Sequence, residues 1–168
     1  ENGDLLIYGE ESGFGTVYFL DENDTTNYSQ VIFDESMDRI KGMVQASDGG
    51  FYLAYSKDYE TKITKIDRNF NEETYIIVEG YCRSLSLATD SNLLIALQIN
   101  ENEHKISKID PITGQELWSD ISFGIYKCFQ FDNHYIALGH TENTSLFSKF
   151  DENGFLVDTK AFGTGILS

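Results

Sequence analysis

The stretch from Lys105 to Trp118, KISKIDPITGQELW, decides the fold because weaker copies of it occur earlier and later in the chain. Ile106 and Ile109 flank two polar residues, and the turn-forming segment 110–114 follows. Apolar residues then resume and end at Trp118. This order predicts two short strands joined by a tight turn, that is, a β-hairpin.

The hairpin belongs to a repeat with a regular spacing. Counterparts of Asp110 at the end of the first strand are Asp21, Asp67 and Asp151, so that successive intervals are 46, 43 and 41 residues. A second marker, an alanine inside an apolar run, occurs at Ala54, Ala96 and Ala137. A period of about 40 to 50 residues built of short strands is typical of propeller blades. The sequence therefore predicts an all-β fold, a β-propeller of four-stranded antiparallel blades.

We expect about four blades within a single domain spanning residues 1–168. The predicted blades cover residues 4–33, 40–78, 83–121 and 127–162. The first of them lacks its innermost strand, which a C-terminal strand at 165–168 would supply if the four blades close into a ring. If the chain instead forms half of an eight-bladed ring, that strand would complete a blade in a second copy. A fragment of a larger propeller is the third alternative, and the sequence leaves all three open.

Composition limits the classes of partner. The chain has 28 acidic against 12 basic residues and a formal net charge of -16, so most of its surface would repel nucleic acid. No apolar run approaches the roughly 20 residues of a membrane-spanning helix, and we predict no membrane span. Two cysteines are too few for a disulfide framework, and we expect Cys82 and Cys128 to be small buried thiols.

Two motifs resemble known propeller repeats. The segment Asp110-Pro-Ile-Thr-Gly-Gln-Glu-Leu-Trp118 resembles the D-x-x-T-G-x-x-x-W signature of the pyrroloquinoline-quinone-like repeat of quinoprotein dehydrogenases and outer-membrane assembly lipoproteins. Asp48-Gly-Gly-Phe51 and Lys149-Phe-Asp-Glu-Asn-Gly154 are similar to the D-G-G-[FY] and K-x-D-x-x-G patterns of bacterial secreted propeller repeats. The resemblance implies a propeller and an extracytoplasmic or cell-surface location.

Among proteins with this repeat, the resemblance associates a quinone cofactor only with the dehydrogenases. Their quinone site uses a vicinal disulfide or an equivalent stacking platform and a calcium ion, and adjacent cysteines do not occur in this sequence. We therefore expect no cofactor. Thr113-Gly114 supplies backbone freedom for a turn, and Trp118 is large enough to fill the gap between adjacent blades, so both features are predicted to be structural.

Residues 21–27 place oxygen-bearing side chains at alternate positions, as a calcium-binding loop does. Thr26 and Ile32 stand where an EF-hand loop requires a glycine and an acidic ligand. The pair Asp-x-Asn also recurs after Asp67 and Asp151, which indicates that these aspartates hydrogen-bond their own turns. We predict no metal site here.

Catalysis has no positive support in the sequence. The three histidines, His104, His134 and His140, lack metal-ligand spacing, and no nucleophile or phosphate-binding motif occurs. Paired carboxylates are common but lie in predicted loops of an acidic chain. We therefore lean against an enzyme and keep a glycan-active enzyme as an alternative function.

A basic residue recurs where each complete blade enters its first strand. Because first strands line the central channel of a propeller, these cations would ring its mouth, with two tyrosines beside them. The predicted ligand-binding residues are Lys41, Arg83, Lys127, Tyr81 and Tyr126. This arrangement predicts an anion or carboxylate pocket at the axis. The competing interpretation is that each cation pairs with an acidic neighbour such as Asp38 or Glu79.

The function that fits these observations is a non-catalytic binding or scaffolding propeller. Rigid blades present their loops at one face of the ring, where a protein, a glycan or a small anionic ligand can be held. We expect either a monomer or a dimer that completes a larger ring. The remaining alternative is a structural fragment whose function belongs to a larger propeller.

Overall fold

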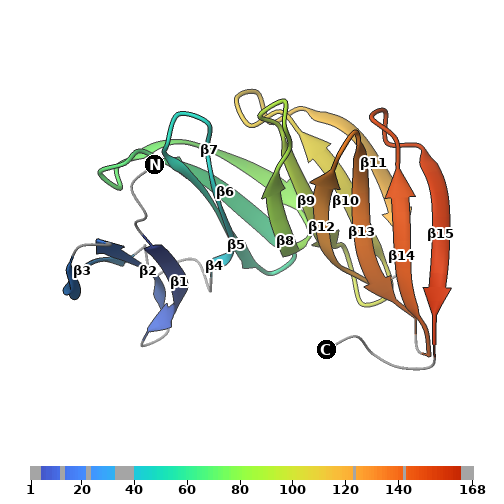
Figure 1. Ribbon diagram of the computed structural model, residues 1–168, viewed down its shortest axis with the longest axis horizontal. Helices are drawn as coiled ribbons and strands as arrows, with labels where there is room; N and C mark the ends of the chain where they lie inside the picture. Colours follow the sequence, from blue (N-terminus) through green and yellow to red (C-terminus); the bar gives the residue numbers. More distant parts are fainter. Residues whose placement is uncertain are drawn as a thin grey trace.

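The computed structural model describes residues 5–11, 14–21, 24–32, 40–122, 124–141 and 143–163. The described residues form strands and turns, which assemble into four antiparallel sheets (Figure 1). The first sheet contains β1 (Leu5–Glu11), β2 (Phe14–Asp21) and β3 (Asp24–Ile32). The second contains β4 (Ile40–Gln45), β5 (Phe51–Lys57), β6 (Glu60–Ile66) and β7 (Glu72–Glu79). The third contains β8 (Tyr81–Leu87), β9 (Leu93–Gln98), β10 (His104–Ile109) and β11 (Glu116–Ser122). The fourth contains β12 (Ile125–Phe131), β13 (His134–His140), β14 (Ser145–Phe150) and β15 (Leu156–Phe162).

Each sheet is a meander in which every strand pairs with the next one along the chain. The predicted all-β class with about four repeating sheets is therefore confirmed. Within the described residues the first sheet has three strands, whereas the other three sheets have four. The C-terminal strand predicted at 165–168 lies outside the described residues, and the division of a single 1–168 domain into blades with those boundaries stays a prediction.

The first strands of the second, third and fourth sheets pack side by side. Strand β4 contacts β8, and β8 contacts β12. Gly42 allows the first of these contacts, because a Cβ at this position would lie only 2.7 Å from the Cβ of Leu85. The prediction that these strands form the inner layer of the repeat agrees with this packing.

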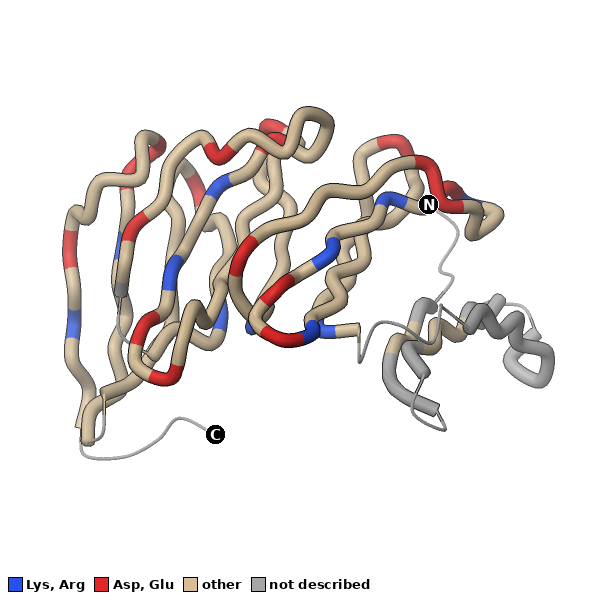
Figure 2. Tube along the Cα trace, turned by 180° about the vertical axis from the view of Figure 1, so that it is seen from behind, with Lys and Arg blue, Asp and Glu red and all other residues tan. Residues whose placement is uncertain are grey.

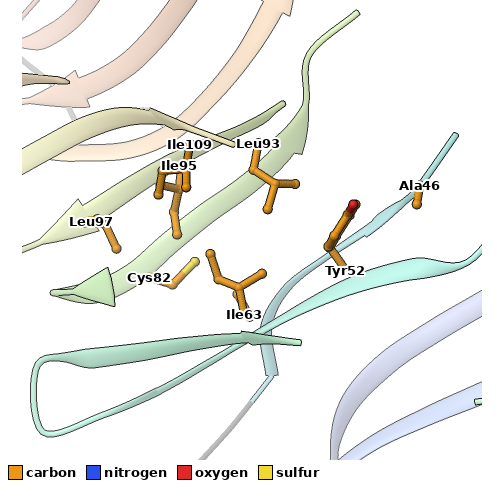
Figure 3. Close-up of a cluster of buried hydrophobic side chains, with 9 residues drawn as sticks. Ala46, Tyr52, Ile63, Cys82, Leu93, Ile95, Leu97 and Ile109 are labelled. Atoms are coloured by element: carbon orange, nitrogen blue, oxygen red, sulfur yellow. The ribbon is translucent and has the colours of Figure 1, made fainter. Parts of the chain in front are cut away.

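The sheets are held together by apolar layers between them. Strands β5 and β9 are buried on both faces, as expected for continuous apolar runs. Figure 3 shows one layer, where Tyr52 and Ile63 of the second sheet face the side chains of the third. Leu93 and Ile95 belong to the third sheet in this layer, and both are fully buried. Burying side chains of this size contributes about 1.5–3 kcal/mol each, so inter-sheet packing dominates the stability of the fold.

The aspartates of the repeated hairpin accept hydrogen bonds from their own turns, as predicted. The backbone N–H of Asn69 donates to Asp67 at 2.8 Å, and that of Asn153 donates to Asp151 at 2.9 Å. In the third sheet, the N–H of Ile112 donates to Asp110 at 2.8 Å. The recurring aspartate is therefore a turn residue.

Trp118 has the inter-blade role predicted from the sequence. Its ring centroid lies 5.2 Å from that of Tyr135 and 6.3 Å from that of Phe150, both in the fourth sheet. The two cysteines are also buried and unpaired, as expected. Burial raises the pKa of the Cys82 thiol to about 12 and also raises the pKa of Cys128, so neither thiol is a nucleophile near neutral pH.

Candidate functional site

The candidate site is centred on the ring of Tyr81, at the start of β8. The Nζ atom of Lys41 lies 4.8 Å from the centroid of this ring. The guanidinium carbon of Arg83 lies 5.4 Å from the same centroid. Two cations from neighbouring sheets therefore converge on one tyrosine, within the range of a cation–π interaction.

A β-bulge near the start of each inner strand positions these side chains. The register of the β4–β5 pair skips Lys41, and that of the β8–β9 pair skips Arg83. In the fourth sheet the skipped residue is Tyr126, and Lys127 pairs with Leu138. A bulge adds a residue and redirects the local side chains. Lys127 therefore lies one residue beyond the bulge of its strand, whereas Lys41 and Arg83 lie at the bulge of theirs.

Arg83 is also tied to the next strand, because its guanidinium donates a hydrogen bond to the side-chain oxygen of Gln98 on β9. Gln98 stands opposite Tyr81 in the β8–β9 ladder. The ring, the guanidinium and the amide thus form one connected group at the end of the third sheet.

A pocket of about 360 Å³ opens beside this group. Its lining consists of Asp58, Tyr59, Tyr81, Arg83 and Gln98. Asp58 and Tyr59 form the tight β5–β6 turn with φ angles of 49° and 60°, and the N–H of Gly80 donates to the carbonyl oxygen of Tyr59 at 2.6 Å. A left-handed conformation is uncommon for a tyrosine and costs on the order of 1 kcal/mol. The turn thus holds a second aromatic ring at the pocket despite backbone strain.

The cations of the predicted site lack carboxylate partners among the described residues. Lys41, Arg83 and Lys127 form no ion pair with a described carboxylate, including Glu79. The other proposed partner, Asp38, lies outside the described residues. In Figure 2 many acidic positions lie at the bends between strands, whereas basic positions occur along the strands. Among the described residues, Lys41 and Arg83 beside Tyr81 thus have no carboxylate counter-ion, in a chain with a net charge of -16.

Two histidines that sequence reasoning did not assign to the site lie near it. The ring of Tyr126 contacts that of His140 with centroids 5.8 Å apart. Burial lowers the pKa of His104, and electrostatic interactions with Arg83 and His140 lower it further. His104 stands opposite Gln98 in the β9–β10 ladder, and this cross-strand pairing places it near the site. Lys127 is exposed and makes no ring contact or ion pair within the described part of the chain.

The groups around Tyr81 combine positive charge, an amide and aromatic rings. Within the described ranges, no three His, Cys, Asp or Glu side chains gather as metal ligands. No helix among the described residues is long and apolar enough to cross a membrane. The convergent cations, the amide of Gln98 and the two tyrosine rings can hold an anionic group against an aromatic surface.

A second polar cluster lies at the opposite end of the third sheet. The side chain of Lys108 is only 8% exposed, and its Nζ atom lies 2.6 Å from a carboxylate oxygen of Asp90. The same Nζ donates to the hydroxyl of Tyr135 at 2.6 Å. An equivalent pair, Lys65 with Asp48, occurs in the second sheet. Because the pair occurs at equivalent positions of the second and third sheets, we interpret it as a structural clamp in these two sheets.

Removing Asp90 is expected to destabilise the fold more than removing its partner. Asp90→Ala leaves the nearly buried ammonium of Lys108 without a counter-ion, which costs about 1–3 kcal/mol because the carboxylate is 48% exposed and partly screened. Lys108→Met leaves no buried charge and should cost less. Urea unfolding at neutral pH measures both, with Glu72→Ala of the exposed Lys62–Glu72 pair as a control within about 0.5 kcal/mol of wild type.

The stabilising effect of Asp90 should depend on pH, and its lowered pKa fixes the direction. Burial raises the pKa of Asp90, but hydrogen bonds from Lys108 and Asn92 outweigh it, and the pKa is lowered overall. The unfolded carboxyl titrates near pH ~3.9, so the contribution of Asp90 is present above this pH and is lost as the pH falls through the folded pKa. The difference between wild type and Asp90→Ala should therefore shrink in acid. A difference that stays constant down to pH ~2 would contradict the assignment.

Comparisons with known proteins identify the architecture. No protein-family model matches the chain, and no curated protein matches it. BamB from Moraxella catarrhalis superposes with a TM-score of 0.62 at 13% identity, over 94% of this chain and 50% of that one. A quinonprotein alcohol dehydrogenase-like protein from Bacteroides thetaiotaomicron gives 0.65 at 15% identity, over 97% and 44%. The Pan2 WD40 domain from Neurospora crassa gives 0.67 at 14% identity, over 95% and 52%.

The fold is a β-propeller. The resemblance of the sequence to quinoprotein-type propeller repeats is confirmed at the level of the fold. At 13–15% identity the likeness establishes the architecture alone. The chain spans about half the length of the propellers on which it superposes.

Proposed function

We propose that this propeller is a non-catalytic binding module that holds a small anion, or an anionic group of a protein or glycan, at the Tyr81 site. The observation that carries the proposal is the convergence of Lys41 and Arg83 on Tyr81, with neither cation neutralised by a described carboxylate. An anionic ligand would supply the missing counter-charge.

The ligand class follows from the chemistry of the site. A guanidinium matches the planar, two-oxygen geometry of a carboxylate, and an ammonium adds a second positive charge. Tyr81 and Tyr59 offer aromatic surface beside these cations, where the apolar side of a sugar ring or side chain can pack. A carboxylate attached to such a body, as in a uronic acid or an acidic peptide, fits the site best. The location we propose for this module is extracytoplasmic.

The test is a binding measurement with defined carboxylates. Thermal-shift screening at low ionic strength would use acetate, citrate and glucuronate, followed by calorimetry on the anion that binds. Lys41→Gln and Arg83→Gln are each expected to weaken binding about tenfold to a hundredfold, because a hydrogen bond to a charged group contributes about 1.5–3 kcal/mol. Raising the salt concentration from 50 to 500 mM should weaken binding as well.

Lys62→Gln is the matched control for these variants. Lys62 also lies over a tyrosine, with its Nζ atom 4.6 Å from the ring centroid of Tyr75, but Glu72 neutralises it at 3.1 Å. Its removal should leave the affinity unchanged. Lys127→Gln and Tyr126→Phe test the two other residues predicted from the sequence. A bound anion whose affinity is the same in the Lys41→Gln, Arg83→Gln double variant would refute the site.

A further inference from the structure

One face of the fourth sheet differs from the equivalent faces of the second and third sheets. In those two sheets, a cross-strand pair on the second and third strands packs against the next sheet. The pair is Ala54 with Ile63 in the second sheet and Ala96 with Ile106 in the third. None of these four side chains is more than 2% exposed. This face therefore forms the contact with the following sheet.

In the fourth sheet the side chains at the same register position are more exposed. Leu138 and Phe147 pair across β13 and β14, and both are only partly buried. Phe131 occupies the position of Ala46 and Ala88, at the end of the first strand of each sheet. Phe131 is 63% exposed, whereas the two alanines are 6% and 3% exposed. The fourth sheet thus presents large apolar side chains where its counterparts are buried.

The lysine–aspartate ion pair of the second and third sheets has no equivalent among the described residues of the fourth sheet. Lys149 is the counterpart of Lys65 and Lys108, and Asp132 lies in the shorter turn of the fourth sheet, but the two form no ion pair with each other in the described part of the chain. In the third sheet, Lys108 is held partly by the hydroxyl of Tyr135, which belongs to the following sheet. A pocket of about 340 Å³, lined in part by Phe147 and Lys149, lies where such a following sheet would pack.

The first sheet has an exposed apolar side chain on its other face, the one that would meet a preceding sheet. Ile7 on β1 occupies the register position of Leu53, Ile95 and Ala137. Those three side chains face the preceding sheet, or lie in the layer shared with it, and are at most 2% exposed. Ile7 is 47% exposed. Among the described residues, therefore, no sheet packs on the outer face of the first sheet or on that of the fourth.

We propose that these two faces meet between two copies of the chain, head to tail, so that two arcs of four sheets close into one ring. The first and fourth sheets lie at opposite ends of the described structure (Figure 1), which a head-to-tail contact requires. The interface would repeat the contact that already joins the second sheet to the third and the third to the fourth. A twofold ring would cover both of these faces with the face-to-face packing that already joins neighbouring sheets. The superposed propellers, about twice as long as this chain, have room for such a ring.

Solution mass and complementation test this interface. Light scattering coupled to size-exclusion chromatography should give a mass twice that of the 19.1 kDa chain. Phe147→Asp and Ile7→Asp are each expected to yield monomers. A mixture of the two variants should form dimers again, because the first keeps an intact β1 face and the second keeps an intact fourth-sheet face. One sound interface of the two is then restored.

Two further variants guard against loss of folding. Phe131→Asp changes a side chain that is already 63% exposed, so it should weaken the dimer without disturbing the core. Phe155→Asp, at a 71% exposed position in the turn before β15, is the control that should leave the dimer intact. Far-ultraviolet circular dichroism and Trp118 fluorescence verify the fold of each variant.

Three outcomes would overturn the proposal. The first is a wild-type chain that keeps the monomer mass at concentrations of about 100 μM or more, which would mean that another partner or intramolecular closure covers the faces. The second is a dimer that survives both Phe131→Asp and Ile7→Asp. The third is a mixture of Phe147→Asp and Ile7→Asp that stays monomeric although each variant is folded, since head-to-tail pairing requires recovery.

Discussion

Replacing Phe150 by alanine is expected to lower the free energy of unfolding by about 3–5 kcal/mol, among the largest effects of any single change in this chain. Phe150 is 1% exposed and packs in the apolar layer between the third and fourth sheets. Its ring stacks with that of Trp118 at 6.3 Å between centroids. Alanine would leave a cavity in that layer, because the surrounding strands are fixed by their ladders and can relax only in part.

The repeat supplies the matched control for this prediction. Ile66 and Ile109 occupy the position of Phe150 in the two preceding sheets, where they are 0% and 2% exposed. Phe150→Ile therefore places a residue that the fold already accepts, and it should cost only about 1–2 kcal/mol. Urea unfolding at a fixed protein concentration measures both variants. Trp118, the only tryptophan, reports directly on this layer. Equal losses for alanine and isoleucine would mean that the Trp118 contact, and not buried volume, governs the site.

The sequence was sufficient to predict the sheets because the repeat carries both local and packing information. Asp67 and Asp151 mark turns through hydrogen bonds to their own backbone, so their spacing fixes where strands end. The apolar runs that contain Ala54 and Ala96 are buried on both sides and fit only a strand between two layers. These features are local in sequence, and an alignment of the repeat copies shows them.

The details of the candidate site depend on contacts that the repeat does not encode. The bulge that frees Arg83 falls one residue earlier in the fourth sheet, at Tyr126, because strand register depends on the partner strand. The convergence of Lys41 and Arg83 on Tyr81 depends on how closely β4 and β8 approach. His104 became relevant only through cross-strand pairing with Gln98. By contrast, the clamp of Lys108 with Asp90 could have been found, since a lysine follows a turn aspartate by 17 residues in the second sheet and by 18 in the third.

Gly154→Ala is expected to lower the free energy of unfolding by about 2–4 kcal/mol. Two effects contribute to this loss, and an experiment can separate them. Gly154 has a φ angle of 83°, and an L-residue in this region costs about 1–2 kcal/mol. A Cβ at this position would also come within 2.4 Å of the indole ring of Trp118, and overpacking of this kind costs about 1–3 kcal/mol. The second sheet has Phe70 at the equivalent turn position with a φ angle of 65°, so the turn itself tolerates a side chain.

Comparison with Phe70 therefore predicts that the contact with Trp118 is the larger part. Gly154→Asn should destabilise nearly as much as Gly154→Ala, although asparagine adopts a positive φ more readily. In a Trp118→Leu background, Gly154→Ala should cost only the conformational part, about 1–2 kcal/mol, because the indole ring is gone. Urea unfolding followed by circular dichroism measures this double-mutant cycle. If Gly154→Ala costs the same in both backgrounds, backbone conformation alone requires the glycine, and the tryptophan of the repeat would not constrain the hairpin of the next blade.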